Sequence, residues 1–144
     1  MNHKKELSAG GIVFKMVNDT VLWLVTQHSQ HKGWSFPKGI VGDENKNESE
    51  QTAALREVQE EGGVTAKIVN DSPVETAYQY KFQDTLIDKT VRYFLMEYIS
   101  GDPKDHDWEV QEAKFLSEDE VRNILTFKAD HEAFEKILRL KLMV

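Results

Sequence analysis

The sequence contains no cysteine and only three prolines among its 144 residues. The absence of cysteine excludes a disulfide framework and a thiolate metal site. No apolar run approaches the ~20 residues that a membrane-spanning helix needs, and residues 1–11 lack the apolar stretch of a signal peptide. We therefore expect a cytoplasmic protein with no membrane partner.

Basic residues are the minority of the charged residues. The chain has 18 Lys and Arg against 25 Asp and Glu, a net charge of −7. This balance argues against broad binding of nucleic acid through a basic face. It leaves phosphorylated small molecules open, because bound cations and a few lysines can reverse the sign locally. The length has room for one core, so a single domain over residues 1–144 is expected.

Acidic residues are concentrated on one short segment that is expected to be helical. Glu57, Glu60 and Glu61 are three and four positions apart, which places their carboxylates on one face of a helix. Like charges at this spacing destabilise a helix by roughly 0.2–0.5 kcal/mol. The alternative to a functional site is an acidic helix face that is simply exposed to solvent. A hard divalent cation needs such oxygen ligands, so the spacing indicates a metal site.

Apolar patterning predicts a mixture of strands and helices. A turn at Asn18-Asp19 is expected to join the first two strands as a hairpin. The expected strands are residues 8–14, 21–28, 74–82, 87–99 and 113–116. The order β-β-α-β-β-β-α-α favours a mixed sheet covered by helices on both faces.

Capping residues define the expected helices. The acidic helix is predicted to start near Glu48 after Asn47 as N-cap, and to end at Gly62-Gly63. Its predicted apolar side consists of Ala54, Leu55 and Val58. Two later helices are predicted, one capped by Ser117 and running through Leu125, and one that starts at Asp130.

The segment from Gly42 to Val64 carries a family pattern, G-x5-E-x7-R-E-U-x-E-E-x-G-U with U aliphatic. The matching residues are Gly42, Glu48, Arg56, Glu57, Val58, Glu60, Glu61, Gly63 and Val64. The chain therefore resembles a Nudix hydrolase. The resemblance implies an α/β/α sandwich with a mixed sheet, whose pattern helix holds Mg²⁺, or Mn²⁺ in its place, for hydrolysis of a phosphoanhydride.

The same resemblance implies roles around the metal. Glu57, Glu60 and Glu61 would be ligands, and Arg56 would orient a ligand carboxylate. Glu109, just before the strand at 113–116, would be a further ligand or the base that activates water. Without the resemblance, Glu109 is interpreted nearly as well as an exposed acid before a strand that has no role in the site.

Gly39 and Gly42 compete for the place of the pattern glycine. Gly42 has the right spacing to Glu48, whereas Gly39 lies in the Phe36-Pro37-Lys38-Gly39 context that relatives show. We expect Gly39 to offer its backbone carbonyl to the metal and Gly42 to be a turn residue.

Four residues resemble the substrate site of the subgroup that hydrolyses diadenosine tetraphosphate to ATP and AMP. Lys38 and Lys89 would contact phosphate oxygens. Tyr80 would stack on adenine and Phe127 on the second adenine. The alternative for Tyr80 is a core position shared with Tyr78 and Phe82, which lie on the same strand face.

Other activities of the same family stay open. They are a nucleoside triphosphate pyrophosphatase, an RNA 5′-pyrophosphohydrolase and a diphosphoinositol polyphosphate hydrolase. A nucleotide-binding module without turnover is a different class, disfavoured because every acid of the pattern is present. A monomer or weak homodimer is expected.

Overall fold

The computed structural model describes residues 2–42 and 45–142. Within that range the strands form one mixed eight-stranded sheet. The strands are β1 (Asn2–Val17), β2 (Thr20–His28), β3 (Trp34–Ser35), β4 (Lys38–Ile40), β5 (Val64–Ile68), β6 (Val74–Phe82), β7 (Thr85–Gly101) and β8 (Val110–Leu116). The helices are α1 (Glu50–Gly62), η1 (Pro103–Asp105, a 3₁₀ turn), α2 (Glu118–Ile124) and α3 (Lys128–Lys141). No helix of this part of the chain is both long and apolar enough to cross a bilayer.

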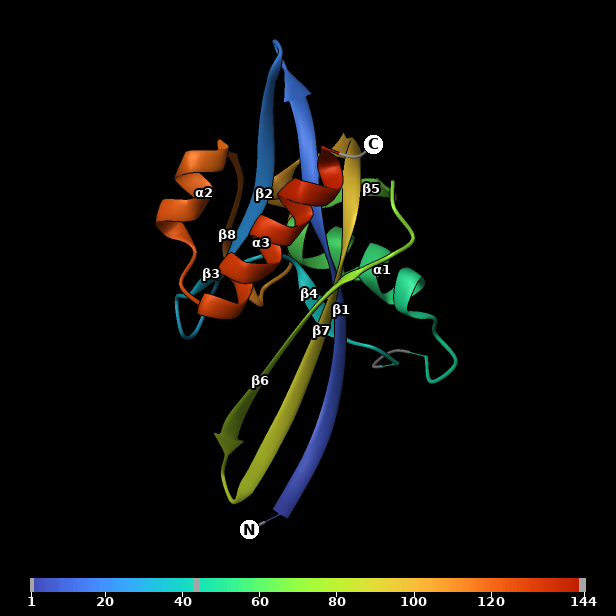
Figure 1. Ribbon diagram of the computed structural model, residues 1–144, viewed down its shortest axis with the longest axis vertical. Helices are drawn as coiled ribbons and strands as arrows, with labels where there is room; N and C mark the ends of the chain where they lie inside the picture. The colour runs from blue at the N-terminus through green and yellow to red at the C-terminus, as the bar shows by residue number, and fades with distance from the viewer. Residues whose placement is uncertain (1, 43–44, 143–144) are drawn as a thin grey trace.

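Helices cover both faces of the sheet, which confirms the expected sandwich (Figure 1). On one face α1 packs with Val13, Leu24, Phe94 and neighbouring residues. On the other face α2 and α3 enclose a core that contains Trp23, Tyr93 and Phe134. Successive residues of β7 alternate between the two cores, as the period of two requires.

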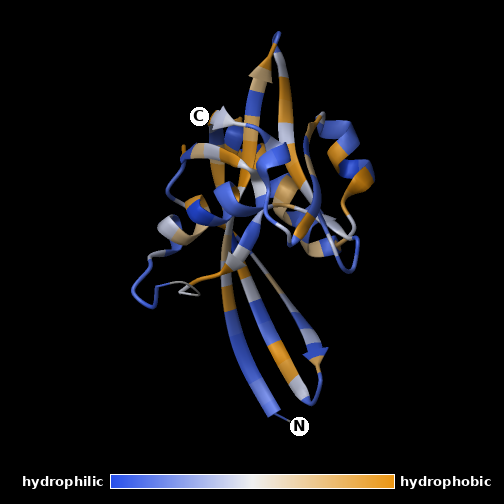
Figure 2. Cartoon of the chain, turned by 180° about the vertical axis from the view of Figure 1, so that it is seen from behind, coloured by the Kyte–Doolittle hydropathy of each residue, from blue (hydrophilic) through white to orange (hydrophobic). Residues whose placement is uncertain are grey.

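The centre of the sheet is the parallel pairing of β1 with β7. Asn2 lies opposite Thr85, and the pairing continues to Phe14 opposite Glu97. The first part of this pairing, with the β6–β7 hairpin beside it, forms a three-stranded arm that extends beyond the helices (Figure 1). Figure 2 shows that the N-terminal end of β1 in this arm is hydrophilic. The arm therefore presents polar side chains from segments that are distant in the sequence.

The predicted long strands and the first hairpin are confirmed. Asn18 and Asp19 have φ values of 51° and 67°, the left-handed conformations that a two-residue hairpin turn needs. The prediction missed β3 and β4, which have two and three residues and hence no readable periodicity. It also missed β5, although its buried and exposed residues alternate.

The predicted start of the acidic helix was wrong by two residues. Ser49, not Asn47, is the N-cap of α1, and its hydroxyl accepts a hydrogen bond from the Thr52 amide at 3.1 Å. Leu55, expected in the core, is exposed, and Ala53 is buried in its place. The predicted end is confirmed, because Gly63 is the left-handed C-cap with φ of 73°.

The two C-terminal helices agree in part with the sequence. The capping box of Ser117 and Glu120 is present at the start of α2. Helix α3 begins at Lys128 rather than at Asp130, and its N-cap, Phe127, makes no side-chain capping bond.

Substitution of Gly63 tests the end of α1. Gly63→Ala should lower the free energy of unfolding by roughly 1–3 kcal/mol, because an L residue is strained at positive φ. The added Cβ would also lie 2.5 Å from the carbonyl oxygen of Asp102. Gly42→Ala is the matched control: its φ is +83°, but the nearest described atom would be 3.7 Å away. Equal losses for the two variants in urea unfolding would contradict the role assigned to this close approach.

Candidate functional site

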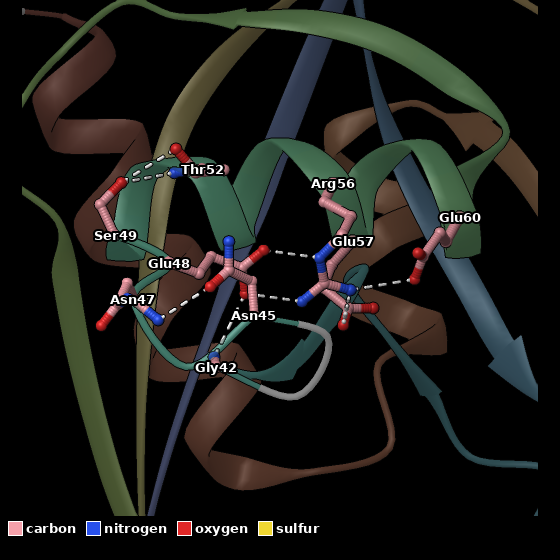
Figure 3. Close-up of polar contacts among 9 residues, drawn as sticks. All are labelled: Gly42, Asn45, Asn47, Glu48, Ser49, Thr52, Arg56, Glu57 and Glu60. Atoms are coloured by element: carbon pink, nitrogen blue, oxygen red, sulfur yellow. Dashed lines mark hydrogen bonds and ion pairs between the residues drawn. The ribbon is translucent and has the colours of Figure 1, made fainter.

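Arg56 on α1 contacts three acidic residues of the family pattern, Glu48, Glu57 and Glu60 (Figure 3). The guanidinium makes a two-bond contact with Glu48, from Nε to Oε2 at 2.8 Å and from Nη2 to Oε1 at 2.9 Å. Its Nη1 donates to Glu57 Oε2 at 3.0 Å and to Glu60 Oε2 at 3.1 Å. One cation therefore holds three carboxylates, and the predicted orienting contacts of Arg56 are present.

Glu48 ties this cluster to the loop before α1. Its Oε1 also accepts the amide proton of Gly42 at 3.2 Å, and its side chain is almost fully buried. The hydrogen bonds from Arg56 lower the pKa of Glu48, so this acid stays ionised. Gly42 has a left-handed φ and lies at a turn, in agreement with the role expected for it.

Gly39 is positioned by close packing against Glu57. A Cβ atom at residue 39 would lie 1.9 Å from Glu57 Oε2, so no other residue fits there without moving the carboxylate. Gly39 lies in β4, and β4 pairs with β1 beside α1. The Phe36-Pro37-Lys38-Gly39 segment and the acidic helix thus meet at Glu57.

Glu57 and Glu61 are acids whose surroundings disfavour the charged form. Burial raises the pKa of Glu57 to about 7, in spite of Arg56. Burial also raises the pKa of Glu61 to about 8, although Lys38 opposes the shift by its charge and by its amide, which donates to Glu61 Oε1 at 3.2 Å. Two buried carboxyl groups that lack enough positive charge are typical of a site completed by a cation.

Glu109 lies near these acids but outside the helix. Its side chain is exposed in the turn before β8, and its negative charge contributes to the raised pKa values of both Glu57 and Glu61. The backbone of this region is tied to α1, since the Asp107 amide donates to the Glu60 carbonyl at 2.8 Å. The charge of Glu109 therefore reaches both of these acids.

The donor set fits a hard cation, although the carboxylates are not gathered into a cage. Across residues 2–42 and 45–142, no three His, Asp or Glu side chains converge as a ready-made metal site. The oxygen-only donors, the buried Glu57 with the partly buried Glu61, and the close approach of Gly39 nevertheless suit Mg²⁺, which prefers few carboxylates and retains water ligands.

Lys38 is the end of a buried polar chain that sequence reasoning missed. Its Nζ donates to Ser35 Oγ at 3.0 Å, Ser35 Oγ lies 3.5 Å from Tyr93 Oη, and Tyr93 donates to Asp130 Oδ1 at 2.9 Å. The Lys38 ammonium can only donate, and the one hydroxyl proton of Tyr93 is donated to Asp130, so Tyr93 accepts from Ser35 and the three bonds have one direction. Tyr93 was expected to be a core residue, which is confirmed, but no local signal links it to Asp130, 37 positions away.

Lys89 and Tyr80 lie on the arm, with Glu6 between them. Tyr80 Oη donates to Glu6 Oε1 at 2.8 Å, and Lys89 Nζ lies 3.2 Å from the same oxygen. Tyr78, Tyr80 and Phe82 are all substantially exposed, so the alternative of a core position for these rings is wrong. Glu6 was missed because only the pairing of β1 with β7 brings it near Lys89.

Phe127 lies at the start of α3, beside the loop after β2. Its ring is partly exposed and makes an edge contact with His31, with 5.7 Å between ring centroids. His31 in turn stacks on His28 at 4.0 Å. A small hollow is bordered by both histidines, Lys38 and Glu61, so Phe127 is linked to the acidic centre through His31.

Lys38, Tyr93 and Lys89 share the face of the sheet that α3 covers. In register, Lys38 on β4 lies opposite Gly10 on β1, which lies opposite Tyr93 on β7. Lys89 lies four residues before Tyr93, on the same side of β7. Both lysines and Tyr80 thus lie on one side of the sheet, with the fully buried Tyr93 between Lys38 and Lys89.

The chain is similar to known proteins over most of its length. The chain is 29% identical over 136 residues to a protein of Mycobacterium tuberculosis (strain CDC 1551 / Oshkosh) named putative mutator protein MutT4, covering 90% of this chain and 53% of that protein. It is 31% identical over 121 residues to the m7GpppN-mRNA hydrolase dcap-2 of Caenorhabditis elegans, covering 84% of this chain and 13% of that protein. The chain thus spans about half the length of the first relative and about an eighth of the second.

Solved structures agree with the fold. The crystal structure of a C. elegans Ap4A hydrolase binary complex superposes with a TM-score of 0.76 at 22% identity, covering 96% of this chain and 99% of that one. At this identity the likeness establishes the architecture alone. A model of the NUDIX domain matches residues 4–138, nearly the whole sequence, and the chain therefore belongs to the NUDIX domain family.

Proposed function

We propose that the protein is a divalent-metal-dependent hydrolase that cleaves a phosphoanhydride in a nucleoside polyphosphate. The observation that carries this proposal is the pair of buried acids, Glu57 and Glu61, held between Arg56 and Lys38. The site combines acids that have too little positive charge around them with a nearby lysine. Such a site suits phosphoryl transfer, in which positioning and charge stabilisation provide most of the catalysis.

The residues proposed to hold Mg²⁺ are those of α1 and its immediate surroundings. They are Glu57, Glu60, Glu61, the carbonyl oxygen of Gly39, and Glu109. When bound, Mg²⁺ neutralises phosphate charge and lowers the pKa of a coordinated water; Mn²⁺ would serve in its place. Arg56 keeps Glu57 and Glu60 oriented, which limits the reorganisation needed on binding.

The protein's own groups then act on the substrate. Lys38 stabilises negative charge on the phosphate chain, since its ammonium acts on Glu61 and the two residues line the same small hollow. Glu109 is the candidate base, since it is exposed to water and near the buried acids. A water oxygen forms a bond to phosphorus, the bridging P–O bond breaks, and the proton of the water passes to the base.

Diadenosine tetraphosphate is the substrate we propose, with ATP and AMP as products. Lys89 and Tyr80 lie on the same side of the sheet as Lys38 and farther along β6 and β7, so only a long ligand would reach them from the acidic centre. Phe127 and Tyr80 offer two separate aromatic surfaces for two adenines. The fold likeness to an Ap4A hydrolase supports this choice, whereas the relative named as an mRNA hydrolase supports testing RNA ends as a second substrate.

Product analysis tests the substrate. With Mg²⁺ present, diadenosine tetraphosphate should give ATP and AMP faster than nucleoside triphosphates, diphosphoinositols or 5′-triphosphorylated RNA react. Tyr80→Ala should raise KM for the dinucleotide about 5- to 100-fold, since a stacked base is worth ~1–3 kcal/mol, and should spare small substrates. Faster cleavage of another substrate would leave the hydrolase activity in place and reject diadenosine tetraphosphate as the substrate. Equal effects of Tyr80→Ala on KM for large and small substrates would reject the placement of Tyr80 in the adenine site.

Substitution of the acids tests the metal centre. Glu60→Gln and Glu61→Gln should each reduce kcat by roughly 100-fold or more, because even residues that merely orient metal ligands are worth about 10- to 100-fold. The circular dichroism spectrum should be unchanged. Glu112→Gln is the control, an exposed acid paired with Lys114 at 3.5 Å on the strand after Glu109. A wild-type rate for the Glu61 variant would reject the assignment.

The stability of the metal-free protein should depend on pH. Because the folded pKa values of Glu57 and Glu61, about 7 and 8, lie above the ordinary value of 4.5, the folded state binds more protons than the unfolded state between about pH 5 and 8. The free energy of unfolding therefore falls as pH rises through this window. In EDTA, Tm should be lower near pH 8.5 than near pH 6, and Mg²⁺ should raise Tm most at the higher pH. Glu61→Gln should flatten the profile measured by calorimetry; an unchanged profile would exclude Glu61 as its source.

A further inference from the structure

Glu6 is a charged residue on the arm that the proposed mechanism does not use. It lies on β1 directly opposite Lys89 on β7, and Lys89 lies opposite Tyr78 on β6. The carboxylate oxygen Oε1 of Glu6 accepts from Tyr80 Oη at 2.8 Å and is 3.2 Å from Lys89 Nζ. Its other oxygen lies 3.8 Å from Lys4 Nζ.

This ion pair differs from an ordinary surface pair. The side chains of Glu6 and Lys89 are only 10% and 11% exposed, whereas Lys4 is 62% exposed. Water screens such a sheltered pair less than a surface pair, so its partners attract each other more strongly. Lys89 is thus already occupied when no substrate is present.

Glu6 carries its negative charge at neutral pH. Burial alone would raise the pKa of its carboxyl group, but the hydrogen bonds from Tyr80 and Lys89 outweigh burial and hold the pKa below its ordinary value. A carboxylate and a phosphate are both anionic oxygen acceptors for a lysine. A phosphate group that reached Lys89 would therefore meet a competing anion already in contact with it.

We propose that Glu6 competes with substrate phosphate for Lys89 and so weakens the binding of polyphosphate chains to the arm. This inference rests on the proposed function, because it assumes that Lys89 contacts a phosphate group of the substrate. Release of Lys89 also frees Oε1 of Glu6 from one of its two donors, while Tyr80 keeps the other. Glu6 thus lowers affinity through charge without being needed for the reaction.

Equilibrium binding of inorganic tripolyphosphate in EDTA and at low salt tests this inference without the metal or turnover. Glu6→Gln preserves the size of the side chain and an oxygen that accepts from Tyr80, and removes the charge. Its Kd for tripolyphosphate should fall about three- to tenfold, the size expected from removing one like charge several ångströms from an anion near the surface. In a Lys89→Met background the same substitution should change Kd much less, which makes a double-mutant cycle.

Two control variants separate competition from other effects. Glu75→Gln removes an acid on the neighbouring strand β6 that pairs with Arg92 at 3.0 Å, and so changes the net charge equally. Tyr80→Phe removes the other hydrogen bond to Glu6 and leaves the ion pair with Lys89. Neither should tighten tripolyphosphate binding.

The inference is overturned by any of three results. The first is an unchanged or higher Kd for tripolyphosphate in Glu6→Gln. The second is an equal fall in Kd for Glu75→Gln. The third is a full fall in Kd when Glu6→Gln is made in the Lys89→Met background. A gain in binding cannot arise from loss of the fold, so it is informative even where stability falls; if Glu6→Gln does not fold, Glu6→Thr provides the same removal of charge. Tighter tripolyphosphate binding by a protein that hydrolyses none of the substrates tested would reject the proposed function and retain the competition.

Discussion

The contact of Arg56 with three carboxylates is the interaction on which the acidic centre depends. Glu48, Glu57 and Glu60 would repel one another if they were brought close without a cation, and two of them are buried. A planar guanidinium can donate in several fixed directions at once, which a lysine ammonium on a flexible stem cannot do. Glu48 accepts from the Gly42 amide and from Arg56, so Arg56 on α1 holds the loop before the helix in place.

Arg56 leaves Glu61 to a different set of contacts. Glu61 points to the Lys38 amide on β4, and the side chain of Lys38 leads away through Ser35 and Tyr93 to Asp130 on α3. The two helical layers are thus connected through the sheet edge by polar groups. The helix of the family pattern lies on one side of the sheet, while Tyr80 and Lys89 face the other side and Phe127 lies at the start of α3.

The sequence predicts the acidic helix well because that helix is a local structure. Spacing places the carboxylates on one face, and glycine marks the end at Gly63. The N-cap was misplaced because Asn47 and Ser49 are both good capping residues, and only the Ser49 hydroxyl reaches an amide of the first turn. Leu55 shows the limit of apolar patterning, since composition does not say which side of α1 the sheet covers.

Non-local contacts account for the features that were missed. Glu6 and Lys89 are 83 positions apart, and Tyr93 and Asp130 are 37 apart. Both pairs depend on strand register or on the docking of α3, and neither leaves a periodic signal in the sequence. The short strands β3 and β4 are defined by their partners β2 and β1 rather than by their own residues.

The parallel pairing of β1 with β7 has a consequence for synthesis of the chain. Residues 2–14 pair with residues 85–97, so the partner of the first strand is complete only after about two-thirds of the 144 residues have been made. Until then β1 can pair with β2 and β4, whose contacts begin at Ser8, but residues 2–7 have no strand partner among the described residues made earlier. Contacts of such long sequence separation slow folding. The arm that carries Glu6 is therefore expected to form late, after the body of the sheet has begun to assemble.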